Sequence, residues 1–310
     1  MGSMQIKSRQ AQTGGCTGLD NPDEPLRCVF STVQEMKVGT GTTARKQQTK
    51  YLWYVEQQDV DEFGVRKINP QFVPTGEEKI IDSETLLADY TPEVEIHNAR
   101  VEPAIQGLTR TVAKGDRHRQ NCEPLSAEME YTKALDVDET NVRAMFGLGL
   151  VYLERQDLEK SRRVFNQLVE LNAAFDLDHK HLFNEFGIAL RKNELYDEAV
   201  QYYSRAVELT DEDENLYFNL SRAFYEKDDW EHCFEFADRA LNIDAYHEHA
   251  LAMCKHIATM ADSEPLRNRH QKPPIPREVA EKVNDLLGED NDMDMSVEIG
   301  PGDFGDSTSN

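Results

Sequence analysis

The stretch from His181 to Leu209 reads HLFNEFGIALRKNELYDEAVQYYSRAVEL, and its spacing decides the fold. On both sides of a polar centre, large apolar residues and small residues recur with helical periodicity. This pattern predicts two amphipathic helices joined by a short turn, with small side chains where the helices approach closely. The eight positions that carry the pattern are Phe183, Phe186, Gly187, Leu190, Ala199, Tyr203, Ala206 and Leu209.

The same eight positions recur in two further segments, with the same intervals of three, one, three, nine, four, three and three residues. A supersecondary unit that repeats at a period of roughly 34 residues predicts a helical solenoid, in which stacked units bury a continuous core. The copy before the first stretch comprises Met145, Leu148, Gly149, Tyr152, Ser161, Phe165, Leu168 and Leu171. The copy after it comprises Tyr217, Leu220, Ser221, Phe224, Cys233, Ala237, Ala240 and Ile243.

At these positions the sequence resembles the tetratricopeptide repeat (TPR) family, over roughly residues 104–262. The resemblance implies a mostly α, TPR-type helix-turn-helix solenoid with clear repeats at about 142–175, 180–213 and 214–247. A degenerate repeat is expected before them and a capping helix after them. The upstream residues that fit its second helix are Ala127, Tyr131, Ala134 and Val137. The chain departs from the family in two respects: the first two repeats are 38 residues apart, and the proline that often closes a repeat is missing.

A small β-rich module is predicted for residues 28–90. The aromatic and β-branched run Tyr51–Val55, turn chemistry near Gly64 and a second run Val65–Ile68 predict a hairpin. A third short run covers residues 79–81, and Ser83 is placed to cap a helix.

The ends of the chain have a different composition. Residues 1–27 hold almost no large apolar side chains and are predicted to be disordered, and residues 39–46 are predicted to form a mobile loop. The segment 91–262 is expected to comprise a linking helical segment, kinked or split at Pro103, followed by the repeats. Residues 263–310 are expected to be a proline-containing linker, a short helix over Arg277–Leu287 and a disordered acidic tail.

Charge narrows the classes of partner. The 310 residues include 34 Lys and Arg against 58 Asp and Glu, which gives a formal net charge of -24. A chain this acidic repels phosphate backbones and anionic lipids, and it has no concentrated basic run. We therefore expect no nucleic-acid binding, and in the absence of a long apolar stretch we expect no membrane insertion.

The five cysteines, Cys16, Cys28, Cys122, Cys233 and Cys254, contain no CxxC pair. This predicts neither a disulfide framework nor a zinc ribbon, and it favours a reducing, cytoplasmic location. The histidines near residues 179–181 and 247–256 match no recognised metal-site spacing and are interpreted as surface residues. The sequence contains no motif for a catalytic nucleophile. We expect no enzymatic activity, no metal and no cofactor.

The resemblance implies that the first helix of each repeat lines a concave groove that binds a partner peptide. An exposed apolar strip is expected at Phe146, Leu150, Ile188 and Phe218, flanked by cations. One alternative is that the chain's own linking or C-terminal helix fills the groove. The candidate partner-binding residues are Arg143, Phe146, Leu150, Asn184, Ile188, Arg191, Lys192, Asn215, Phe218, Asn219, Arg222 and Tyr225.

Some family members clamp a chaperone's C-terminal carboxylate, but Phe146 and Leu150 stand where such a clamp needs polar groups, so this activity is not assigned. The predicted function is that of an adaptor or scaffold for another protein, bound as a peptide or helix with apolar anchors and a carboxylate. Two alternatives remain open at this point. One is a secretion-type or assembly chaperone, and the other is a β module that senses a ligand and relays its state through the repeats.

Overall fold

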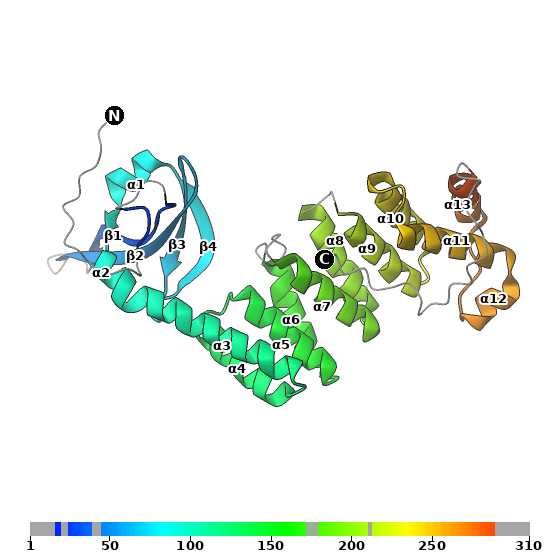
Figure 1. Cartoon of the computed structure of the whole chain (residues 1–310), viewed down its shortest axis with the longest axis horizontal. Coiled ribbons are helices and arrows are strands. Elements are labelled where there is room, and N and C mark those ends of the chain that lie inside the picture. The colour runs from blue at the N-terminus through cyan, green and yellow to red at the C-terminus, as the bar shows by residue number, and fades with distance from the viewer. Residues whose placement is uncertain are drawn as a thin grey trace. The chain divides into compact units, whose positions relative to one another are not determined.

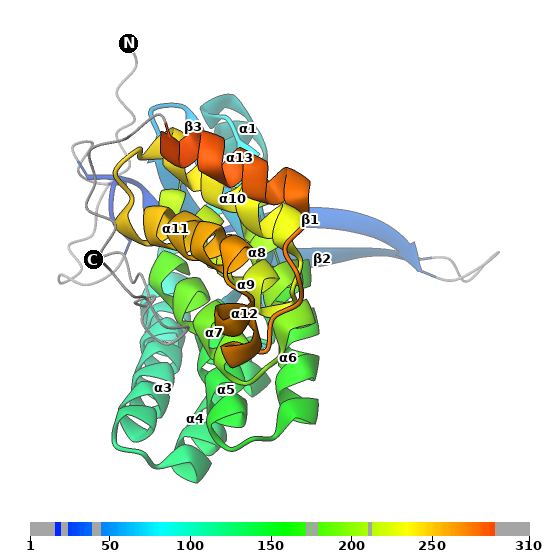
Figure 2. The ribbon, with the colours of Figure 1, turned by 90° about the vertical axis from the view of Figure 1, so that its right-hand side faces the viewer.

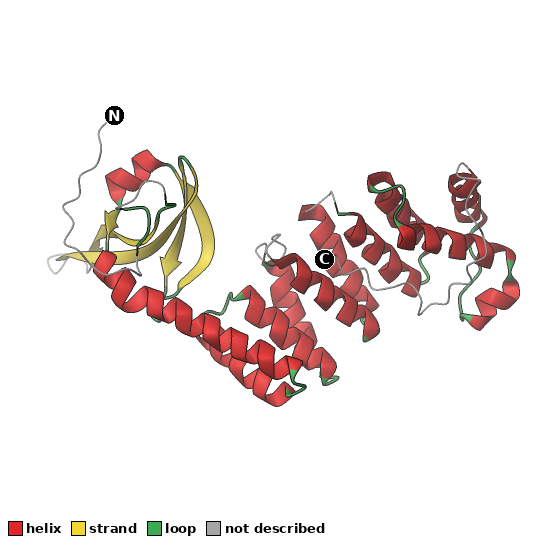
Figure 3. Cartoon of the chain, viewed as in Figure 1, coloured by secondary structure: helices red, strands yellow, loops and turns green. Residues whose placement is uncertain are grey.

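The computed structural model describes residues 16–19, 24–38, 45–171, 174, 179–209 and 213–288. The chain divides into two compact units, Met1–Met145 and Phe146–Asn310. All described strands lie in the first unit (Figure 1), and helices make up the described regular structure of the second (Figure 3). The mostly α fold with an N-terminal antiparallel sheet, expected from the sequence, is confirmed.

The first unit is built on a five-stranded sheet in the order β4-β3-β2-β1-β5. The predicted hairpin is confirmed, because β2 and β3 pair antiparallel with Val55 opposite Val65. The sheet buries Cys28, Phe30 and Val55 in one cluster and Val29 and Tyr54 in a second. Strand bounds are β1 (Arg27–Val38), β2 (Arg45–Asp59), β3 (Glu62–Ile68), β4 (Pro74–Ile81) and β5 (Thr91–Pro92).

The sequence predicted no strand before Tyr51, but strand β1 covers Arg27–Val38. The contacts made at the start of β1 correct two expectations. Thr17 pairs with Arg27 through two backbone hydrogen bonds of 3.0 and 3.1 Å, so residues 16–19 are ordered against the sheet. This register places Cys16 opposite Cys28, and the two form a disulfide with a Cα–Cα distance of 4.5 Å. The expectation of no disulfide is therefore wrong, and the cysteine-based argument for a reducing compartment loses its support. Most of the predicted disordered N-terminus and of the predicted loop 39–46 lies outside the described residues.

A helical segment follows the sheet. It comprises α1 (Ser83–Asp89), α2 (Val94–Ile96), the π-helix η2 (His97–Val101), α3 (Glu102–Gln120) and α4 (Pro124–Val137). The irregularity expected at Pro103 lies just before it, as the π-helical turn, and Pro103 itself occupies the first turn of α3. Helices α3 and α4 pack together, and a Cβ on Gly115 would lie 2.6 Å from the Tyr131 ring. Helix α4 buries Ala127, Tyr131 and Ala134, as expected for the degenerate repeat.

Three helical hairpins carry the repeats. Their helices are α5 (Val142–Glu154) with α6 (Leu158–Glu170), α7 (Lys180–Lys192) with α8 (Tyr196–Leu209), and α9 (Glu214–Glu226) with α10 (Trp230–Ile243). Each hairpin turns through a non-glycine residue with a left-handed φ: Gln156 at 60°, Glu194 at 60° and Asp228 at 61°. A left-handed residue just past a helix ends that helix. The turn geometry therefore repeats with the sequence.

The small residues at the repeat positions allow the helices to approach closely. A Cβ on Gly187 would lie 2.4 Å from Cζ of Tyr203, and a Cβ on Gly149 would lie 2.6 Å from the Phe186 ring. In the third repeat Ser221 donates a 2.6 Å hydrogen bond to the carbonyl of Cys233, so a buried hydroxyl replaces the glycine without an unpaired polar atom.

The C-terminal part caps the array. Helix α11 (Glu248–Asp262) follows α10, and α13 (Arg277–Gly288) packs against α11 and α10 (Figure 2), burying Val279 and Val283. The linker expected from residue 263 onward contains a short helix, α12 (Glu264–Arg269). Residues 289–310, predicted to be an acidic tail, lie outside the described residues. No described helix is both long and apolar enough to span a membrane.

Candidate partner-binding groove

Most of the predicted groove positions of the second unit lie on the first helices of neighbouring repeats, α7 and α9, which contact each other, and the other two, Phe146 and Leu150, lie on α5. In α7, Asn184, Ile188 and Arg191 are spaced by four and three residues and so share one face. In α9, Asn219 and Arg222 are three residues apart and share a face in the same way.

The exposed apolar strip expected from the sequence is wrong. Phe146 and Phe218 are completely buried, Leu150 is 3% exposed and Ile188 is 7% exposed. Phe146 packs edge-on against Phe186 and Tyr202, with ring centroids 5.8 and 6.5 Å apart. Phe218 lies against the imidazoles of His247 and His249 at 5.4 and 5.5 Å. These side chains belong to the core of the stacked repeats, because neighbouring helices cover the positions that the repeat motif leaves unassigned.

Tyr225 is also buried, at 1% exposure. Lys272, from the segment after α12, places its Nζ 4.4 Å from the centroid of the Tyr225 ring and donates a 2.7 Å hydrogen bond to the Tyr225 carbonyl. The same ammonium lies 2.7 Å from a carboxylate oxygen of Asp228. The chain's own C-terminal segment therefore covers the C-terminal end of α9.

Two further predicted residues have partners within their own unit. In the first unit, Arg143 forms a salt bridge of 2.8 Å with Asp116. In the second, Asn215 donates a 2.8 Å hydrogen bond to Glu214 and lies 3.3 Å from Nε2 of His247. These contacts give both side chains a structural role.

Asn184 and Asn219 differ from the other polar residues of this face. They are 2% and 4% exposed. Neither the amide nitrogen nor the amide oxygen of Asn184 has a hydrogen-bond partner in the described part of the chain, and the same holds for the amide nitrogen of Asn219. A buried polar group without a partner costs about 1–3 kcal/mol of folding free energy. Part of the hydrogen-bonding capacity of these two amides is therefore unused by the described residues.

Cations flank the two amides. Arg191 is 9% exposed and Arg222 is 5% exposed, while Lys192 at the end of α7 is exposed to solvent. Nη1 of Arg191 lies 3.8 Å from a carboxylate oxygen of Glu226, so its charge is partly balanced. Buried guanidinium groups with several N–H donors suit carboxylate recognition.

The histidines interpreted as surface residues are in part buried, which corrects that expectation. His247 is 7% exposed and caps α11, accepting a 3.1 Å hydrogen bond from the Ala250 amide. His256 is 6% exposed, and burial lowers its pKa to about 4. Burial likewise raises the pKa of the Cys233 thiol to about 12, so this thiol is protonated and unreactive at neutral pH.

A family comparison assigns the repeats. The tetratricopeptide repeat profile matches residues 112–175 and 184–247, which covers the degenerate repeat and the three clear ones. Residues 112–175 and 184–247 of the chain are tetratricopeptide repeats. The longer spacing between the first two repeats falls between the end of α6 and the start of α7. The positions where the family often has a proline fall between successive repeats.

Several solved structures match part of the chain at low sequence identity. MamA from Desulfovibrio magneticus RS-1 is 16% identical, with 59% of this chain and 97% of that chain covered and a TM-score of 0.39. PilF of Pseudomonas aeruginosa is 18% identical, with 61% and 78% covered and a TM-score of 0.37. YrrB, described as a TPR protein with an unusual peptide-binding site, is 20% identical, with 58% and 86% covered and a TM-score of 0.38. No curated protein matches the chain in sequence.

The TPR array makes this protein, in general terms, a protein-interaction scaffold. The face of α7 and α9 combines buried amides with buried guanidinium groups. Unlike the apolar strip expected from the sequence, this arrangement is polar.

Proposed function

We propose that this TPR protein binds an extended acidic segment of a partner protein along α7 and α9, and that binding rather than catalysis is its function. The observation that carries the proposal is the pair of buried amides, Asn184 and Asn219, with polar atoms that lack partners among the described residues. Buried polar side chains in native proteins are almost always hydrogen-bonded. A ligand that supplies the missing hydrogen bonds is one explanation for such an exception, and it is the one proposed for these two amides.

The chemistry of an amide selects the shape of the partner. A side-chain amide offers two donors and one acceptor, which complements the N–H and C=O of a peptide group. An extended peptide has these groups free, whereas a helix uses its own internally. The proposal therefore favours an extended segment over a helix, and the burial of Ile188 removes the apolar anchors expected from the sequence.

The chemistry of the cations selects the charge of the partner. Arg191, Lys192 and Arg222 lie on the same two helices as the amides, and a carboxylate gains most from a guanidinium removed from water. The chain as a whole carries a net charge of -24. A short acidic segment at this local cationic face meets less repulsion than a globally acidic partner would.

The chain's C-terminal helix α13 packs on helices other than the two that carry the proposed binding residues. Helix α13 packs against α11 and α10, and Lys272 covers Tyr225 at the C-terminal end of α9. Of the residues that the proposed segment uses, Asn184 and Asn219 lie in the first half of α7 and α9, and Arg222 lies about one turn before Tyr225.

The test separates binding from folding. The double variant Asn184→Ala, Asn219→Ala removes buried amides that lack partners, so the free energy of unfolding is expected to stay the same or rise. Partner affinity is expected to fall by about 10-fold to 100-fold, because each lost hydrogen bond to the peptide contributes about 1 kcal/mol. The measurement is affinity purification with quantitative mass spectrometry, followed by titration of the recovered partner's acidic segment as a synthetic peptide.

A matched control changes the same residue type elsewhere. Asn166 is exposed on α6, so Asn166→Ala is expected to leave both stability and capture unchanged. Arg222→Gln keeps hydrogen-bonding capacity without the charge and is expected to weaken binding of acidic peptides only. If the double variant captures the same proteins as the wild type, with the same affinity, the proposed groove is wrong.

A second candidate function has one observation in its favour. A pocket of about 390 Å³ lies within the first unit and is lined by, among others, Tyr54, Arg66, Ile105 and Asp138. Side chains of both charges at its wall suit a small polar ligand, which corresponds to the ligand-sensing alternative. A melting shift of the full chain on addition of such a ligand, lost in Arg66→Ala, would support this candidate over a scaffold alone.

A further inference from the structure

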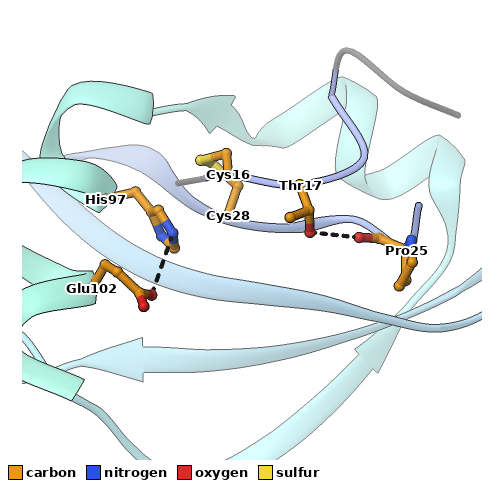
Figure 4. Close-up of a disulfide and its surroundings, with 6 residues drawn as sticks. All are labelled: Cys16, Thr17, Pro25, Cys28, His97 and Glu102. Atoms are coloured by element: carbon orange, nitrogen blue, oxygen red, sulfur yellow. Dashed lines mark hydrogen bonds and ion pairs between the residues drawn. A yellow bond between two sulfur atoms is a disulfide. The ribbon is translucent and has the colours of Figure 1, made fainter. Parts of the chain in front are cut away.

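Three potential metal ligands meet beside the start of the sheet in the first unit. Sγ of Cys16, Sγ of Cys28 and a ring nitrogen of His97 all lie within 4.8 Å of one another. The three come from the segment before β1, from β1 itself and from the π-helix η2. Figure 4 shows the imidazole of His97 between the two sulfurs and the carboxylate of Glu102.

The backbone holds the two cysteines in place. Thr17 and Arg27 exchange both backbone hydrogen bonds, so Cys16 and Cys28 form the next, non-hydrogen-bonded cross-strand pair, in which side chains are closest. Gly18 has a φ of 77°, and a Cβ there would lie 2.6 Å from the Cα of Leu26. Only glycine fits this position, so the loop that carries Cys16 is built to close against β1.

The third potential ligand, His97, is buried and has a ring nitrogen without a partner among the described residues. Its side chain is 1% exposed, and its Nδ1 has no hydrogen-bond partner among the described residues. Its Nε2 lies 3.9 Å from a carboxylate oxygen of Glu102, and its ring stacks on Tyr54 at 6.1 Å. π-helical turns such as the one that holds His97 often occur at functional sites.

We propose that, when Cys16 and Cys28 are reduced, their thiolates and Nδ1 of His97 bind a zinc ion. Two thiolates and one imidazole form a recognised zinc ligand set, with a fourth position left for solvent. A carboxylate oxygen of Glu102 lies 3.9 Å from the other ring nitrogen, Nε2, which is the side on which metal-bound histidines commonly have a carboxylate partner. The disulfide accounts for the two cysteines but leaves the buried Nδ1 without a partner, whereas the zinc site accounts for all three groups.

Reduction of the disulfide provides the two thiols that bind zinc. A phosphine reductant breaks the Cys16–Cys28 bond, and water supplies the oxygen of the resulting phosphine oxide and the two protons of the thiols. Zinc binding then displaces those two protons to solvent, so the affinity rises with pH.

The test uses the full chain, reduced with a phosphine, loaded with Zn²⁺ and passed over a desalting column. One tightly bound zinc per chain is expected by elemental analysis, and Co²⁺ in place of Zn²⁺ is expected to give the absorption of a cobalt–thiolate complex. In Cys16→Ser the affinity for Zn²⁺ should fall by at least about 100-fold, since a thiolate ligand is lost. Cys16 is only partly buried and precedes the sheet, so this variant tests the site without removing a core residue.

Two controls make the result decisive. Cys122→Ser removes an exposed free cysteine and is expected to bind zinc as the wild type does. The oxidised wild-type chain, with its disulfide intact, is expected to bind no zinc. His97→Gln is expected to weaken binding while keeping the cobalt–thiolate absorption at high metal concentration. Equal zinc affinity in the reduced wild type and in Cys16→Ser, or no zinc in the reduced wild type, would overturn the proposal.

Discussion

The hydroxyl of Tyr225 lies 3.1 Å from Nε2 of His256, and this contact joins α9 to α11. Both side chains are buried, at 1% and 6% exposure, and the rings lie 5.8 Å apart. Nζ of Lys272 lies 4.4 Å from the centroid of the Tyr225 ring, and the ring of His270 lies 5.3 Å from that of His256. A residue expected in the binding groove is thus part of a buried polar cluster that ties the last repeat to its cap.

This cluster makes the stability of the second unit dependent on pH. Burial, with His270 and Lys272 nearby, lowers the pKa of His256 to about 4, below its ordinary value. The stabilisation that comes from keeping His256 neutral in the folded state is complete above a pH of about 6.5 and is lost as the pH falls toward 4. In this range the unfolded chain binds a proton at His256 that the folded chain does not bind. We expect the free energy of unfolding to fall by up to about 3 kcal/mol over this range, since one pKa unit corresponds to about 1.4 kcal/mol.

The measurement is denaturant unfolding at several pH values in a Trp53→Phe background, where Trp230 is the single tryptophan and packs 5.7 Å from Tyr225. His256→Gln should remove the part of this pH dependence that His256 contributes, while His247, whose pKa burial also lowers, keeps its own part. His181→Gln, at an exposed position on α7, should leave it unchanged. A His256→Gln protein with the slope of the wild type would show that His256 does not titrate as described.

Lys272 is expected to stabilise the second unit through its buried ammonium. Its side chain is 9% exposed and donates to the Tyr225 carbonyl and to Asp228, both at 2.7 Å. Lys272→Met keeps the aliphatic part of the side chain and removes these hydrogen bonds. The free energy of unfolding should therefore fall by about 1.5–3 kcal/mol, the usual range for hydrogen bonds to charged groups. Urea unfolding followed by Trp230 fluorescence measures the change. Lys282→Met, at an exposed position on α13, is the control, and equal midpoints for the two variants would contradict this role.

Two glycines in helices should respond to alanine in opposite directions. A Cβ on Gly187 would meet the Tyr203 ring at 2.4 Å, whereas Gly107 in α3 has open space around it. Gly187→Ala should destabilise the second unit by about 1–3 kcal/mol through overpacking. Gly107→Ala should stabilise the first unit by about 0.4–1 kcal/mol, because alanine loses less backbone entropy in a helix. Thermal and denaturant unfolding of both variants provide the comparison, and a Gly187→Ala protein as stable as the wild type would refute the close approach.

Local spacing was enough to predict the repeat helices. A contact within one helical hairpin joins residues that are still close in sequence, such as Gly187 and Tyr203, so the small residue at Gly187 marked a close packing that the structure confirms. The hairpin β2–β3 was predictable for the same reason, since its strands are adjacent in sequence. Strand β1 was not predicted because its alternation is weak, and β5, the shorter of its two partner strands, leaves no pattern in the sequence.

By itself, then, the sequence determined a TPR array with an N-terminal sheet, because both follow from interactions between near neighbours in the chain. Only the tertiary structure decided which groove residues are core, because the burial of Phe146 and Phe218 depends on rings from other helices. It also decided the Cys16–Cys28 bond and the approach of His97 to it, since a bridge between Thr17 and Arg27 and a distant π-helical turn create that juxtaposition. Spacing reports on one element at a time, whereas exposure and ligand clusters depend on which elements meet.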